Sequence, residues 1–186
     1  NCSGGGARFD PGMLYYSPQI WCSDDTDAIE RLRIQEGTEL IYPLSTMGAH
    51  VSDCPNHIVG RTTPFETRGN VALAGTFGYE LDITKISDEE RTQIPGQVEL
   101  YHKYQELIQA GDYYRITSWS DRNPFDCWET AAKDGTHALV TCVQVRLVTC
   151  AHTPCVCLLV SSQRFSCMAL SQSLLSFPDA PPLFPA

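Results

Sequence analysis

Residues 20–32, IWCSDDTDAIERL, place a tryptophan before a run of acids and a helical pattern after it. Three aspartates fall within four positions: Asp24, Asp25 and Asp27. Because a helix N-terminus stabilises nearby negative charge, we expect Ser23, or its rival Thr26, to cap a helix with these acids in its first turn. Capping alone needs only one or two acids, so the rest of the run requires another explanation.

Two further interpretations of the acids remain. An EF-hand calcium loop needs a set spacing of acids, a glycine and a terminal glutamate, and this run lacks that spacing and the glycine. A carboxyl beside an apolar ring such as Trp21 can keep its proton near neutral pH and act as a general acid. The start of a helix is also where strand-to-helix loops carry function in a (β/α)₈ barrel. Capping, metal binding and catalysis therefore all stay open.

The composition limits the function classes. The 186 residues, 42% of them hydrophobic, suit one domain or pieces of two. The net charge of −9 argues against nucleic acid as a partner, because neutralising phosphates needs Lys and Arg. We expect no signal peptide, because the chain starts NCSGGG without a basic region and an apolar region after it. We expect no transmembrane helix, because no run of about 18 apolar residues occurs. The NCSGGG start also suggests a chain cut at its front. Five of the nine cysteines crowd into the last 45 residues, which favours a reducing cytoplasm.

Local patterns predict the elements of the first half. Residues 24–37 predict one helix, with Gly37 just after its end. The apolar run at 38–45, TELIYPLS, predicts a buried strand, and 47–64, punctuated by glycine and proline, predicts a loop. Residues 63–82 begin with a helical pattern that glycines interrupt.

Residues 87–111 predict a longer helix, opened by Ser87 and Glu90 at the spacing of a capping box and kinked or restarted at Pro95. Alternating patterns then replace the helical one, and a Lys-Asp-Gly turn separates two strand-like runs. Helices alternate with strands up to about residue 112, and hairpins follow. This order predicts an α/β piece joined to an all-β piece.

The composition changes near residue 146. From there to residue 186 only three side chains are charged: Arg146, Arg164 and Asp179. This tail has neither helical nor alternating periodicity over a useful length. It is either a genuine hydrophobic C-terminal segment or an out-of-frame sequence, and we expect no chemistry from it.

Other candidate sites are weaker. Residues 1–14, NCSGGGARFDPGML, lack the Gly-Lys-Ser/Thr of a phosphate loop, and form either a flexible turn or a loop that contacts sugar hydroxyls. The cysteines of 150–157, CAHTPCVC, do not have the spacing of a common zinc module. His50 and His57 flank Cys54 and could bind a metal, although packed or solvated histidines are commoner. We expect no metal and no cofactor.

Four motifs together resemble the bacterial α-galactosidases of glycoside hydrolase family 36: CSGGGARFDPGMLYY, WCSDDTDAIERLRIQEGT, YPLSTMGAHVSDCPNH and TPFETRGNVALAGTFGYELD. The resemblance runs from residue 1 to about residue 145. It implies an α/β fold in which residues 1–112 are the C-terminal part of a (β/α)₈ TIM barrel. Residues 113–145 would then begin an antiparallel β domain, followed by the atypical tail at 146–186.

The resemblance also implies a function. Members of this family are retaining enzymes that remove terminal α-galactose from melibiose and raffinose-type sugars, which requires a nucleophile and an acid/base. By resemblance Asp24 is the acid/base, and Cys2 and Gly5 contact the galactose. Cys22 stands where a threonine is usual, and Ala7 where a glycine is usual.

The family's nucleophile motif, Lys-Trp-Asp-Met-Asn-Arg, is absent from the sequence. We therefore expect a fragment that is inactive alone. We expect it to be cytoplasmic, to have an α-galactoside oligosaccharide as its substrate, and to have neither nucleic acid nor membrane as a partner. The full-length parent is expected to be a homo-oligomer. A non-catalytic sugar-binding module or a structural fragment is the alternative.

Overall fold

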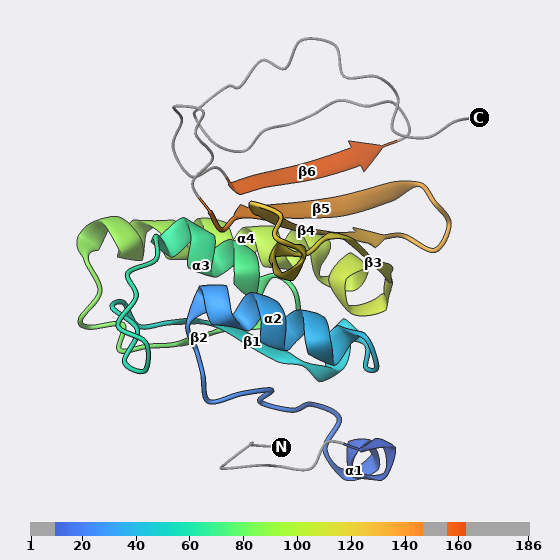
Figure 1. Cartoon of the computed structure of the whole chain (residues 1–186), viewed down its shortest axis with the longest axis horizontal. Coiled ribbons are helices and arrows are strands. Elements are labelled where there is room, and N and C mark those ends of the chain that lie inside the picture. The colour runs from blue at the N-terminus through green and yellow to red at the C-terminus, as the bar shows by residue number, and fades with distance from the viewer. Residues whose placement is uncertain (1–9, 147–155, 163–186) are drawn as a thin grey trace.

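The fold is known from a computed structural model that describes residues 10–146 and 156–162. The helices are α1 (Pro11–Tyr16), α2 (Ala28–Glu39), the 3₁₀ turn η1 (Leu44–Thr46), α3 (Phe65–Ala72), α4 (Asp88–Ala110) and the 3₁₀ turn η2 (Trp119–Asp121). The strands are β1 (Gly48–Ser52), β2 (Thr76–Glu80), β3 (Asp112–Thr117), β4 (Phe125–Ala131), β5 (His137–Gln144) and β6 (Val156–Ser162). Figure 1 shows the two sheets that these strands form, with helices between them.

The first sheet is parallel. β1 pairs with β2 from Gly48 opposite Thr76 to Ser52 opposite Glu80, and α3 connects them. Ile20 adds a parallel bridge to Met47, and α2 follows it. Three successive units, each a strand segment followed by a helix, therefore run side by side, which is the α/β order expected from the sequence.

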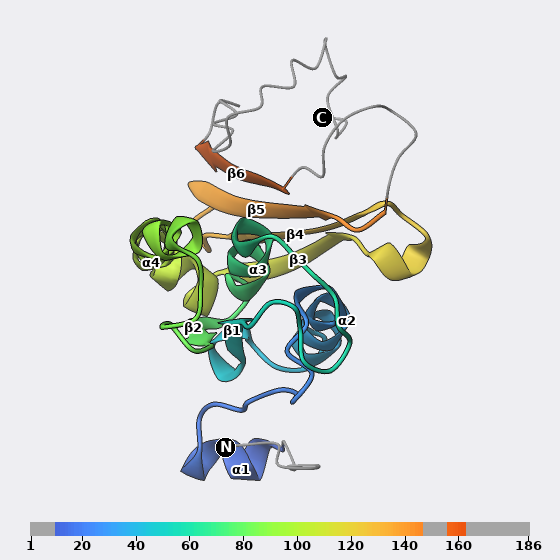
Figure 2. The same ribbon diagram turned by 90° about the vertical axis from the view of Figure 1, so that its left-hand side faces the viewer.

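The second sheet is antiparallel, in the order β3-β4-β5-β6. In its central strands β4 and β5, buried residues alternate with more exposed ones, so one face of these strands is covered. Figure 2 shows α3 and α4 between this sheet and the β1–β2 pair. Leu139 packs in a cluster with Leu107 and Ile108 of α4, and Trp128 in a second cluster with Val71 of α3. Helices thus cover one face of each sheet.

The long helix and the hairpin confirm the sequence predictions. The hydroxyl of Ser87 caps α4 by accepting a hydrogen bond from the backbone N–H of Glu90, 3.1 Å away. The helix does not restart at Pro95 but runs through it. β4 and β5 form the predicted hairpin, and Gly135 in its turn has a φ of 68°, a left-handed conformation that glycine adopts easily.

Two predictions about α2 are wrong. The helix begins at Ala28 and its N-cap is Asp27, not Ser23 or Thr26, so the acids precede the helix instead of filling its first turn. Gly37 lies inside the helix, which continues to Glu39.

The strand predicted at 38–45 is also wrong. That run contains the end of α2 and the turn η1, and its apolar Leu40 and Ile41 are exposed. The strand forms instead at β1, in the segment predicted as a loop, where every residue is buried. The tail, in which the sequence showed no useful periodicity, contributes the strand β6, which pairs with β5. No helix in the described ranges is long and apolar enough to cross a bilayer.

Candidate functional site

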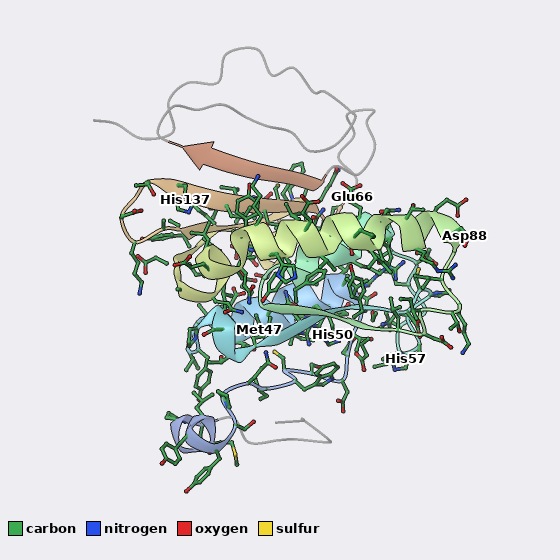
Figure 3. The ribbon with its side chains drawn as sticks, turned by 180° about the vertical axis from the view of Figure 1, so that it is seen from behind. Met47, His50, His57, Glu66, Asp88 and His137 are labelled. Carbon is green, nitrogen blue, oxygen red and sulfur yellow. The ribbon has the colours of Figure 1, made fainter. Side chains whose placement is uncertain are left out.

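The candidate site lies where the parallel strands end. Because β1 and β2 are parallel, Ser52 and Glu80 end them at the same edge. In open α/β sheets and barrels alike, ligands bind at this carboxyl edge, in the loops that lead into the helices. In Figure 3, Met47, His50 and His57 follow one another toward the side of the molecule where Asp88 marks the start of α4.

A ring stack and a close polar contact mark this edge. The indole of Trp21 stacks on the imidazole of His50, with centroids 4.2 Å apart and planes 7° from parallel. The Nε2 atom of His50 lies 2.8 Å from a carboxylate oxygen of Glu80, without the alignment of a hydrogen bond. Burial, aided by the charge of Arg31, lowers the pKa of His50 to about 4. His50 is therefore neutral at neutral pH.

The pKa of Glu80 shows which other groups surround it. Burial raises this pKa, the charges of His57 and Arg31 oppose the rise, and the charges of Asp24 and Asp53 add to it. These groups come from the loops that follow Ile20 and β1, and from α2. The carboxyl edge thus brings Asp24 close enough to Glu80 for the two charges to interact.

The three aspartates have different roles. Asp27 is buried, and its carboxylate accepts hydrogen bonds from the backbone N–H groups of Ile29 and Glu30, at 3.1 and 3.0 Å. Asp25 accepts from the N–H of Asp27 at 3.1 Å. Capping thus accounts for Asp27, and turn formation for Asp25, whereas Asp24 is exposed at the carboxyl edge.

Buried polar side chains hold the loops of this edge in place. Arg68 donates to the carbonyl of Ser52 at 2.6 Å and to that of Thr63 at 3.0 Å, and it pairs with Glu90. The hydroxyl of Ser52 donates to the carbonyl of Thr26 at 2.7 Å. The loop before α2 is therefore tied to the end of β1, and α4 is tied to both through Arg68.

A second ion pair fixes the start of α2. Arg61 contacts the carboxylate of Asp27 and, at 3.3 Å, that of Glu30. Asn56 donates from its amide to the hydroxyl of Thr26 at 3.1 Å. These contacts connect the loop after β1 to the acid-rich run and limit how far Asp24 can move.

The structure describes only one of the three residues predicted for the site. Asp24 lies at the carboxyl edge and its role stays a prediction, whereas Cys2 and Gly5 lie outside the described residues. His50, considered as a loop metal ligand with His57 and Cys54, belongs to β1 instead. In the part of the chain that the structure describes, no group of three His, Cys, Asp or Glu side chains could hold a metal ion.

Sequence reasoning missed Glu80 and the contact it makes with His50. The available signal was its place after the run at 76–79, at the end of a short strand that follows α3. That signal is weak because β2 pairs with β1, which lies more than 20 residues earlier in the sequence.

Comparison with known proteins identifies the family. The family model for melibiases matches residues 1–111. The chain is 55% identical over 148 residues to the bifunctional α-galactosidase/sucrose kinase AgaSK of Mediterraneibacter gnavus, covering 77% of this chain and 15% of that protein. It is 52% identical over 145 residues to the α-galactosidase AgaA of Geobacillus stearothermophilus, covering 78% of this chain and 20% of that protein. The chain thus spans no more than about a fifth of the length of these relatives.

Comparison with solved structures gives the same family. The galactosidase domain of AgaSK superposes with a TM-score of 0.76 at 52% identity, over 83% of this chain and 21% of that one. A variant of AgaA in complex with raffinose gives a TM-score of 0.76 at 50% identity, over 81% of this chain and 21% of that one. The chain therefore belongs to the melibiase family, and it corresponds to a partial region of the glycoside hydrolase family 36 α-galactosidases.

Proposed function

We propose that the chain is part of a retaining α-galactosidase that hydrolyses terminal α-galactosyl residues of melibiose and raffinose-type oligosaccharides. In this proposal Asp24 is the general acid/base, and Cys2 and Gly5 contact the galactose. The relatives are α-galactosidases, and one was solved with raffinose, which supports the substrate class. The single observation that carries the role of Asp24 is its exposure at the carboxyl edge while Asp27 caps α2.

We also propose that residues 1–112 end a (β/α)₈ barrel, that 113–145 begin an antiparallel β domain, and that 146–186 form an atypical tail. Three parallel strand-and-helix units end with α4, and the antiparallel β3, β4 and β5 follow, which supports this division. Within the described residues β2 pairs with β1 alone, so a further strand can pair at its other edge.

The chemistry assigned to Asp24 has two steps. In the first, its carboxyl protonates the glycosidic oxygen as the sugar leaves, while a carboxylate nucleophile attacks the anomeric carbon and forms the galactosyl-enzyme. In the second, the Asp24 carboxylate takes a proton from the water that releases the galactose. Such acid/base help contributes on the order of 10²–10⁴-fold to the rate. The nucleophile has no matching motif in this sequence, so we propose that the chain alone is inactive.

The test compares two neighbouring aspartates in the full-length parent. Asp24→Asn should lower turnover of raffinose by on the order of 10²–10⁴-fold, because the amide can neither give nor take the proton. Asp25→Asn is the matched control and should retain most of the activity, since its carboxylate serves the turn before α2. An external anion such as azide should restore turnover of an aryl galactoside in the Asp24 variant. If Asp24→Asn turned over raffinose at the wild-type rate, Asp24 could not be the general acid/base.

The alternative is a non-catalytic sugar-binding or structural fragment. The observation that bears on it is the Trp21–His50 stack, because one face of the indole is already covered by a ring of the chain itself. Calorimetric titration of the isolated chain with galactose distinguishes the two. Tight binding would favour the sugar-binding module, whereas no binding is expected from an incomplete catalytic pocket.

A further inference from the structure

Two cysteines lie opposite each other on neighbouring strands of the antiparallel sheet. The register of β4 and β5 pairs Cys127 with Cys142 directly. Directly opposed residues of antiparallel strands point to the same face, with Cα atoms about 4.5–5.5 Å apart. A disulfide bridges Cα atoms about 4.4–6.8 Å apart. The backbone of this pair therefore already has the spacing of a disulfide.

Both thiols lie on the sheet face turned away from the helices. Their strand neighbours Asp126 and Val143 are buried on the covered face, whereas Cys127 and Cys142 are half-buried. Neither cysteine is in a disulfide, and the two side chains contact each other through a hydrogen bond. A small reagent thus meets two adjacent thiols on this face.

We propose that Cys127 and Cys142 form a reactive dithiol that exchanges with a small-molecule disulfide, such as oxidised glutathione, and closes into a disulfide joining β4 to β5. This site lies outside the carboxyl edge of the parallel strands and is independent of the proposed hydrolase chemistry. It makes the hairpin a target of oxidation.

The order of the two steps follows from the thiols. A hydrogen bond in which the Cys142 thiol donates to the Cys127 sulfur, together with burial, raises the pKa of Cys142, so Cys142 keeps its proton and the first attack falls to Cys127. The Cys127 sulfur attacks one sulfur of the oxidant, which forms a mixed disulfide and releases one thiolate. Cys142 then loses its proton and attacks Cys127, releasing the second thiolate. The dithiol gives up two electrons and two protons, and the oxidant becomes two thiols.

One competitor for Cys142 exists in the same sheet. The register of β5 and β6 pairs Cys142 with Cys157. The experiment must therefore identify which bond forms, and the sequence makes this straightforward. Trypsin cleaves after Arg122, Lys133 and Arg146, so that peptides 123–133 and 134–146 contain one cysteine each, Cys127 and Cys142 respectively.

The test treats the folded full chain with oxidised glutathione, alkylates the remaining thiols and analyses the tryptic peptides by mass spectrometry. The expected product is a linked pair of peptides 123–133 and 134–146, which separates on reduction. Cys22 and Cys54, the matched free thiols outside this sheet, should remain alkylated as in the untreated chain. Alkylated Cys127 and Cys142 after treatment, or a bond between Cys142 and Cys157, would overturn the proposal.

Two variants sharpen the result. Cys142→Ser removes the resolving thiol, so Cys127 should accumulate as the glutathione mixed disulfide. Cys157→Ser should leave the 127–142 link in place. Loss of that link in Cys157→Ser, or failure of Cys127 to take up glutathione in Cys142→Ser, would also overturn the proposal.

Discussion

The imidazole of His50 is held between two groups: the Trp21 indole stacks on its face, and the Glu80 carboxylate lies 2.8 Å from its Nε2 atom. The ring belongs to β1, and its two neighbours come from the segment after Ile20 and from the end of β2. This contact joins all three parallel segments at one point. The protonation state of His50 therefore bears on how the Trp21 segment, β1 and the end of β2 pack together.

The first prediction concerns the titration of His50. Its pKa is lowered in the folded chain from 6.5 to about 4, so the unfolded chain binds the proton more readily. The stability due to this group is present above about pH 6.5 and is lost as the pH falls toward 4. NMR titration of the imidazole should give a pKa near 4, and His50→Gln should remove that part of the acid destabilisation. A midpoint near 6.5 would contradict the prediction.

The second prediction tests which residue caps α2. Asp27→Ala removes the acceptor for two backbone N–H groups and the partner of Arg61, and should cost about 1–2 kcal/mol of unfolding free energy from the cap alone. Ser23→Ala, the control, removes only the acceptor for the backbone N–H of Asp25 and should cost less, about 0.5 kcal/mol. Urea unfolding measures both. Equal losses would mean that the helix start does not depend on Asp27.

The third prediction concerns a buried carboxyl between α2 and the antiparallel sheet. Burial raises the pKa of Glu39 to about 8; a hydrogen bond from Tyr113 opposes the rise, and the charges of Glu36 and Asp126 add to it. Arg115 faces the same cluster and pairs with Glu36 at 2.8 Å. The folded chain thus keeps a proton on Glu39 that the unfolded chain releases above about pH 4.5.

Stability should therefore fall as the pH rises from about 4.5 to about 8, by up to about 5 kcal/mol, since one pKa unit is worth about 1.4 kcal/mol. Glu39→Gln should remove this slope and stabilise the chain at pH 8. Glu99→Gln, on the exposed side of α4, is the control and should leave the slope unchanged. Unfolding midpoints in urea across this pH range provide the measurement, and a slope that survives in Glu39→Gln would refute the prediction.

The fourth prediction compares two arginine ion pairs. Arg68 is buried and holds two carbonyls and Glu90, so Arg68→Ala should cost about 3–5 kcal/mol by leaving buried partners unpaired. Arg91 pairs with Asp88 at the exposed start of α4, so Arg91→Ala should cost about 0–1 kcal/mol. Thermal unfolding of the two variants measures the stability that each substitution removes. Similar losses for both variants would argue against the structural role of Arg68.

Elements governed by local rules were predictable from the sequence. Ser87 lies three residues before Glu90, and α4 starts there. The turn at Gly135 lies between two alternating runs, and the hairpin forms around it. In both cases the residues that determine the element are close in sequence, and local patterns of residue type and spacing describe such elements well.

Elements governed by distant contacts were not predictable. β1 is a strand because it pairs with β2 and is buried, whereas its own sequence, GAHVS, has only one strong strand former. The start of α2 was predicted at Ser23 or Thr26, but the N-cap is Asp27, whose carboxylate also pairs with the distant Arg61.

The candidate site divides in the same way. The position of Asp24, between a strand segment and a helix, follows from the local pattern of residues 20–32. The contact between His50 and Glu80 depends on the register of two strands, and no nearby residue encodes that register.

Tyr113 of β3 packs against both the hydrophobic cluster under α4 and the one under α2 and α3. Its side chain is thus shared by parts of the chain that look separable in sequence. An engineer who exchanged this sheet for that of a relative would also have to transplant the helical surfaces beneath it. Chimaeras with a crossover at residue 112 should therefore fail more often than those that carry α4 and β3 together.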